Sequence, residues 1–341
     1  MRRSDPRRVL WAVTALAGCA APGDVSRGEP RAGAVLTSAE RVATTLRARA
    51  DVVSIVVRVV DGDDIAAVAA AAVDVRAHGV RLGYWIEVAR APSLAGTQPG
   101  LMASLQGHDG WRALFPDAPV PAPGEVVKVF PYVPILSRAG FAAQSARVRA
   151  LLAALPSADE VYLHGLQGAP SACGCGHPTC RWAMDYFVRA PGRTPMAGPE
   201  PYGPGAAAAF AGEVAAAAKG ATVIPVWVGE CGAGDARCHG VPCYDGRCWS
   251  ALAEQWAPVA SAFERLAVFV PSASIGVAGD AVHTRDAVAE LARVERAGAP
   301  AVRIDESRLV PIVEGPAAAI PGAVVADVAL EQSWEPRLWR P

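Results

Sequence analysis

The stretch Val161–Tyr186 reads VYLHGLQGAPSACGCGHPTCRWAMDY and joins a short apolar strand to a cysteine-rich loop. The strand covers Val161–Leu163, and Gly165 and Gly168 break the extended pattern after it. Three cysteines follow, and four more come after the next strand and helix. Seven of the eight cysteines therefore lie in two loops that each follow a strand. We expect the rest of the chain to be the scaffold that brings these loops together.

Outside this stretch, short runs rich in valine and isoleucine alternate with longer helical runs. Strands are expected at Val52–Val60, Arg81–Val88, Val126–Val133, Glu160–Leu163, Thr222–Gly229, Leu266–Val270, Ala301–Ile304 and Ala323–Leu330. Near-continuous apolar strands alternating with helices indicate a parallel sheet covered on both faces. The pattern predicts an α/β fold, a (β/α)8 TIM-type barrel with the long cysteine loops after strands 4 and 5. A doubly wound parallel sheet is the alternative.

The first eighteen residues have the features of an export signal. Arginines precede a short apolar run, Val9–Ala17, which is too short to be a stable membrane anchor. The run ends in Leu16-Ala17-Gly18-Cys19, which resembles the lipobox of bacterial lipoproteins. That resemblance implies that Cys19 is acylated and becomes the mature N-terminus. We therefore expect a signal peptide over 1–18, a lipid-anchored tether over 19–40 and a single barrel domain over 41–341.

Removal of residues 1–18 leaves 28 Lys and Arg against 32 Asp and Glu, a net charge of −4. This balance gives no indication of nucleic-acid binding. The expected partner is a lipid bilayer, reached through acylated Cys19. The expected location is the cell envelope, in the periplasm or at the outer-membrane surface.

Polar and aromatic residues gather where the expected strands end, which is where barrels of this type place their active sites. Trp85 and Glu87 share one face of their strand because side chains alternate. The candidate catalytic residues are Glu87, Glu230 and Asp305. The candidate substrate-binding residues are Trp85, Arg90, Tyr132, His164, Gln167, Trp227, Arg303 and Trp334.

Carboxylates and tryptophans at one mouth are similar to those of glycoside-hydrolase-type barrels. Common retaining barrels carry the acid/base carboxylate at the end of strand four, where this chain has Gln167. Glu230 is therefore the expected acid, with Glu87 or Asp305 as base or nucleophile. The resemblance implies hydrolysis of a polysaccharide. The alternative is a non-catalytic carbohydrate-binding or structural surface lipoprotein.

The two cysteine loops are expected to emerge side by side from neighbouring strands. Outside the cytoplasm, disulfides are one expectation for Cys173, Cys175, Cys180, Cys231, Cys238, Cys243 and Cys248. The other is a structural zinc bound by Cys173, Cys175, Cys180 and either His177 or one cysteine of the second loop. Seven is an odd number, so at least one thiol must be free, bound to metal or paired with another chain.

Overall fold

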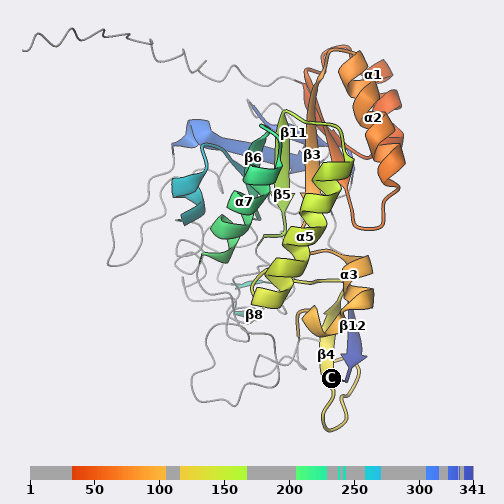
Figure 1. Cartoon of the computed structure of the whole chain (residues 1–341), viewed down its shortest axis with the longest axis vertical. Coiled ribbons are helices and arrows are strands. Elements are labelled where there is room, and N and C mark those ends of the chain that lie inside the picture. Colours follow the sequence, from red (N-terminus) through yellow and green to blue (C-terminus); the bar gives the residue numbers. More distant parts are fainter. Residues whose placement is uncertain are drawn as a thin grey trace, which may run out of the picture.

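The computed structural model describes residues 33–104, 116–166, 205–228, 237–238, 241–242, 258–269, 305–314, 322–328, 330 and 334–340. Eight parallel strands within these ranges close into a barrel (Figure 1). In chain order they are β1 (Ala34–Thr37), β2 (Ser54–Val59), β3 (Arg81–Glu87), β5 (Glu160–His164), β6 (Thr222–Val228), β9 (Leu266–Phe269), β10 (Leu309–Glu314) and β11 (Val324–Ala326). The closed order confirms the predicted TIM-type barrel over the doubly wound alternative.

Helices cover the outside of the barrel, among them α1 (Val42–Ala48), α2 (Ile65–Ala77), α5 (Arg138–Ala154) and α7 (Ala206–Ala217). The Asp64 carboxylate accepts from the Ala66 and Ala67 amides at the start of α2, and the Ser137 hydroxyl accepts from the Gly140 amide at the start of α5. These caps satisfy amides that a helix leaves unpaired at its first turn. None of the helices in the described part of the chain combines the length and apolar character that crossing a membrane requires.

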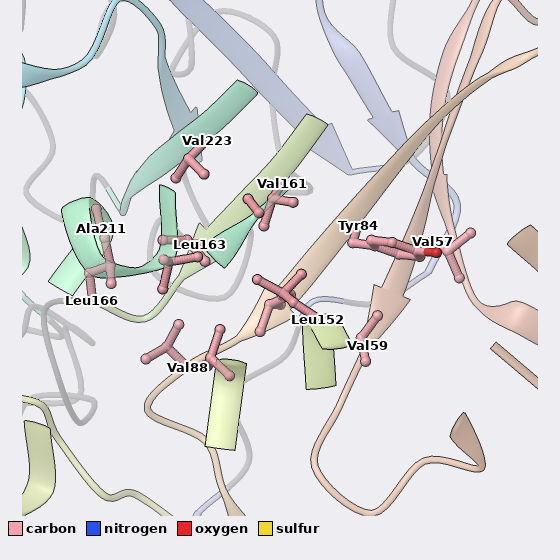
Figure 2. Close-up of a cluster of buried hydrophobic side chains, with 14 of the residues drawn as sticks. Val57, Val59, Tyr84, Val88, Leu152, Val161, Leu163, Leu166, Ala211 and Val223 are labelled. Atoms are coloured by element: carbon pink, nitrogen blue, oxygen red, sulfur yellow. The ribbon is translucent and has the colours of Figure 1, made fainter. Parts of the chain in front are cut away.

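A continuous apolar layer lies between the strands and the helices, and Figure 2 shows part of it. Tyr84, Val161 and Val223 point outward from β3, β5 and β6, while Leu152 and Ala211 come from α5 and α7. Each fully buried Val or Leu in such a layer contributes about 1.5–3 kcal/mol. This layer is the main reason why the helices stay on the barrel.

The residues that alternate with this outer layer fill the barrel lumen. Trp85 is fully buried there, stacked on Tyr162 at 6.1 Å between ring centroids and edge-on to Phe269 at 6.2 Å. Small and branched residues from the remaining strands complete this second cluster. The lumen is a packed core rather than a pore, so chemistry has to take place at its ends.

One expected strand lies outside the barrel. Val126–Phe130, the main part of the run expected over Val126–Val133, forms β4, which pairs antiparallel with the C-terminal strand β12 (Glu335–Trp339). This two-stranded sheet lies close to α3 (Pro92–Thr97) below the barrel in Figure 1. The ammonium of Lys128 is buried there and donates to the carbonyls of Gly100 and Met102 at 3.2 and 2.9 Å. The long connection from β3 to α5 is therefore a small accessory unit.

Two barrel strands lie where the sequence did not predict them. Ala34–Thr37 was expected to belong to the tether over 19–40, but it is β1 and pairs with both β2 and β11. Leu309–Glu314, which was not predicted as a strand, is β10 and pairs with β9 and β11. The expected strand at Ala301–Ile304 lies outside the described residues.

Candidate functional site

Glu87 and His164 are the last residues of neighbouring strands, β3 and β5, and they are register partners. Trp85 and Tyr162, two residues earlier on each strand, point into the lumen, so alternation directs Glu87 and His164 inward as well. The carboxyl ends of the strands form the mouth at which barrels of this fold carry their active sites. The pair thus occupies the mouth end of the lumen.

The Glu87 carboxylate contacts three side chains in this buried position. His164 Nδ1 lies 2.6 Å from Oε2, the Trp85 indole donates to Oε1 at 3.1 Å, and Arg58 Nε lies 3.4 Å from Oε1. Glu87 is 3% exposed and His164 is 1% exposed. Arg58 extends from β2, so three adjacent strands contribute to one charged cluster.

Burial alone raises the pKa of Glu87, because a charged carboxylate loses its hydration in the lumen. Contact with His164, its hydrogen bond, Arg58 and the Trp85 indole outweigh that effect and lower the pKa to about 2. Glu87 is therefore ionised at neutral pH and is not a proton donor. Since an ionised carboxylate only accepts hydrogen bonds, Nδ1 of His164 carries the proton in this contact.

The surroundings fix both members of the pair. The His164 ring lies 4.9 Å from the Trp85 ring and 5.8 Å from the Phe269 ring, measured between centroids. Arg147 of α5 donates to the backbone carbonyls of Glu87 and Val88 at 2.7 and 2.9 Å. A helix therefore clamps the end of the strand that carries the carboxylate. Such an arrangement can orient an imidazole for proton transfer, because the carboxylate sets its tautomer and direction.

Several predicted site residues occupy other places. Trp85 is an interior residue that holds Glu87 and does not offer a platform at the mouth. Trp227 points outward into the layer beneath the helices, because Ile224 and Val226 take the inward positions of β6. Asp305 is exposed and precedes β10, so it lies at the opposite end of the barrel from Glu87. Its carboxylate caps the turn that follows, accepting from the Ser307 amide at 2.9 Å.

Three further candidates lie in or directly beside the accessory unit. Arg90 and Tyr132 face each other across an antiparallel bridge, with Tyr132 buried and Arg90 half-buried. Trp334 is half-buried just before β12. The candidates outside the described residues are Glu230, Gln167, Arg303, Cys173, Cys175, Cys180, His177, Cys231, Cys243 and Cys248.

The cysteine loops are described only in part. Cys238 lies in the two-residue strand β7 (Arg237–Cys238), whose partner is β8 (Val241–Pro242). No group of three or more metal-binding side chains occurs among the residues that the structure describes. Disulfides or zinc in these loops therefore stay predictions.

Two charged residues of the mouth, Arg58 and Glu314, were not predicted from the sequence. Arg58 interrupts the apolar strand SIVVRV, and a charge within such a run is a usable signal for a functional or paired position. Glu314 ends β10, and alternation with Val310 and Ile312 of the lumen cluster directs it inward. Its Oε1 accepts from the Leu330 amide at 2.9 Å.

The fold and this cluster define the chain as a parallel α/β barrel with a carboxylate–histidine pair at its mouth. Comparisons with family models, curated proteins and solved structures found no match. Function is therefore inferred from the site itself.

Proposed function

We propose that this chain is a lipid-anchored barrel protein of the cell envelope that hydrolyses glycosidic bonds of a polysaccharide. The observation that carries the proposal is the ionised Glu87, which is held against His164 at the mouth end of the lumen. Glycosidic cleavage needs a proton for the leaving oxygen and negative charge near the sugar ring, which becomes positive in the transition state. The pair supplies both kinds of group.

His164 is the proton donor in this scheme, and Glu87 is the residue that positions it. Because Nδ1 is directed at Glu87, proton transfer to the leaving oxygen uses Nε2. Glu87 stabilises the protonated imidazole, as the carboxylate does in other carboxylate–histidine pairs. The low pKa of Glu87 assigns it this role rather than that of the acid. Glu230, the acid expected from the sequence, lies outside the described residues, and its role stays a prediction.

The anchor part of the proposal rests on the leader and on Leu16-Ala17-Gly18-Cys19. In this scheme the lipid on Cys19 keeps the barrel at a membrane surface, where envelope polysaccharides are accessible. Since β1 begins at Ala34, the tether between lipid and barrel is shorter than the range 19–40 expected from sequence.

A second candidate function is carbohydrate binding or a structural role without catalysis. The near-complete burial of Glu87, His164 and Trp85 favours it, because a buried ion pair can simply join the strand ends. The two functions differ in what the pair does when sugar is present. Only hydrolysis depends on the ability of His164 to give up a proton.

The test compares turnover of para-nitrophenyl and methyl glycosides, and of soluble polysaccharides, by wild-type protein, Glu87→Gln and His164→Ala. Loss of the acid should slow methyl glycosides by about 10²–10⁴-fold and nitrophenyl glycosides much less, because nitrophenolate leaves without a proton. Glu160→Gln is the matched control. Glu160 is equally buried in the lumen but at its opposite end, bonded to Tyr162 and Arg265. Sugar binding without turnover by wild-type protein would support the second candidate.

A further inference from the structure

We infer that Glu314 is the second carboxyl group of this site and acts as the base that activates the attacking water. The inference rests on the proposed function and assigns a residue that the sequence analysis did not consider. Glu314 is half-buried at the mouth end of β10, whereas Glu87 is almost completely enclosed. A carboxylate that receives a proton from water has to be reachable from the mouth, and Glu314 satisfies this condition.

The strand registers place Glu314 and Glu87 on opposite walls of the mouth. β3 and β10 are four strands apart in either direction around the closed order. In one direction, Glu314 pairs with Ala326, Ala326 with Leu36, Leu36 with Val56, and Val56 with Gly83, which lies four residues before Glu87. In a TIM-type barrel the tilt of the strands shifts the level by about one residue per strand. Over four strands this shift amounts to about four residues, which brings Glu314 to the level of Glu87.

The other direction around the barrel gives the same result. Glu87 pairs with His164, and because Leu163 pairs with Pro225, the next residue on each strand sets His164 level with Val226. Val226 pairs with Ala267 and Ala267 with Val310, which is four residues before Glu314. Glu87 and Glu314 consequently occupy one layer of the lumen, facing each other. His164 belongs to the layer directly below.

The expected separation of Glu87 and Glu314 leaves open space between the two walls of the mouth. Eight strands about 4.8 Å apart and tilted by about 36° give about 15 Å between opposite backbones. Two glutamates that each reach inward by about 4 Å leave a gap of about 7 Å. A gap of this size between Glu87 and Glu314 has room for a water molecule beside the Glu314 carboxylate.

One described contact orients Glu314. The Leu330 amide donates to its Oε1, and Leu330 is itself buried in the lumen cluster. The segment after β11 thus anchors one oxygen of the carboxylate. This anchoring is what a base needs, since it has to be in position before the water arrives.

The proposed hydrolysis needs no reactant other than the glycoside and one water molecule. Glu314 takes one proton from water, and the water oxygen bonds to the anomeric carbon. The bond from that carbon to the leaving oxygen breaks with its electron pair on the oxygen, which takes a proton from Nε2 of His164. One water is consumed, and both protein groups regain their starting state by exchange with solvent.

The experiment uses the purified full chain in detergent, with para-nitrophenyl and methyl glycosides as probes. Glu314→Gln should lower kcat on both leaving groups by about 10²–10⁴-fold with KM nearly unchanged, whereas His164→Ala spares the nitrophenyl substrate. Azide should restore turnover of nitrophenyl glycosides by Glu314→Ala and yield a glycosyl azide, because azide needs no base. The control is Asp327→Asn, which lies just beyond β11 and contacts Thr45 and Arg41. It should keep wild-type kcat.

The outcomes distinguish failure of the role of Glu314 from failure of the hydrolase activity. If wild-type protein and Asp327→Asn turn over the probes and Glu314→Gln keeps more than about a tenth of that rate, the role of Glu314 is wrong and the hydrolase stands. Retained configuration in the wild-type product, followed by proton NMR, also overturns Glu314 as base. If no glycoside is turned over by wild-type protein, both the hydrolase and the role of Glu314 are rejected. Should Glu314→Gln unfold, absence of azide rescue in a folded Glu314→Ala rejects the role.

Discussion

Replacement of Glu87 by glutamine should destabilise the protein at neutral pH and should do so less as the pH falls. The folded protein lowers the pKa of Glu87 from 4.5 to about 2. A difference of this size corresponds to about 3 kcal/mol of stability when the carboxylate is ionised. Glu87→Gln removes the charge that Arg58 and His164 contact, so we expect its free energy of unfolding at about pH 7 to be about 3 kcal/mol below wild type.

The pH dependence follows from the direction of the pKa change. A carboxyl group whose pKa is lower in the folded protein stabilises the fold fully at pH values above its pKa in the unfolded chain. This stabilisation is lost as the pH falls through its pKa in the folded protein. The difference between wild type and Glu87→Gln should therefore be full above pH 4.5 and shrink towards pH 2. Below that range both proteins carry a neutral side chain at this position.

Urea unfolding followed by tryptophan fluorescence at several pH values measures this difference. Asp305→Asn serves as the control, because Asp305 is exposed at the other end of the barrel and should change stability little. A loss below about 1 kcal/mol at neutral pH, or a difference that stays constant down to pH 2, would refute the assignment of Glu87 as a buried anion.

Three other predictions concern parts of the chain away from the pair. Cys19→Ala should leave an unprocessed precursor in membrane fractions, and a water-soluble mature form on immunoblots would contradict acylation at Cys19. The two cysteine loops should be crosslinked or metal-bound, so reaction of all seven of their thiols with a thiol reagent in native, metal-free protein would reject a joined rim. Burial lowers the pKa of Lys128 from 10.5 to about 8, so the stability of wild type relative to Lys128→Met should rise between about pH 8 and 10.5, as measured by urea unfolding. A flat difference over that range would contradict a buried amine.

The barrel could be predicted from sequence because its strands are near-continuous apolar runs. Which of these runs belong to the barrel sheet could not be predicted. The run that begins at Val126 has the same composition as a barrel strand, yet its partner is β12, more than two hundred residues later. Such a pairing leaves no local signal. β1 has only four residues, and Pro311 interrupts the apolar run of β10, so neither resembles a typical strand.

The errors in the predicted site follow from these strand assignments. Glu87 was identified because alternation along β3 is a local property that needs only the strand itself. Asp305 was placed at the mouth because the seventh strand was expected one segment too early; the same shift concealed Glu314. Trp227 was misplaced because sequence does not reveal which face of a strand that is apolar on both faces points inward.

Both ends of the lumen bury a glutamate, and comparison of the two shows why only one is proposed as a site. At the amino-terminal end, the described partners of Glu160 are Arg81, Arg265 and the Tyr162 hydroxyl. Arginine and tyrosine side chains ordinarily hold their protons well above neutral pH, so this cluster is suited to closing the barrel and not to moving protons. At the mouth, Glu87 instead contacts a histidine, the side chain that most often serves as acid or base in proteins, and a second carboxylate, Glu314, ends β10 with its side chain directed inward. Burial of charge is common to both ends; the exchangeable proton is what distinguishes the mouth.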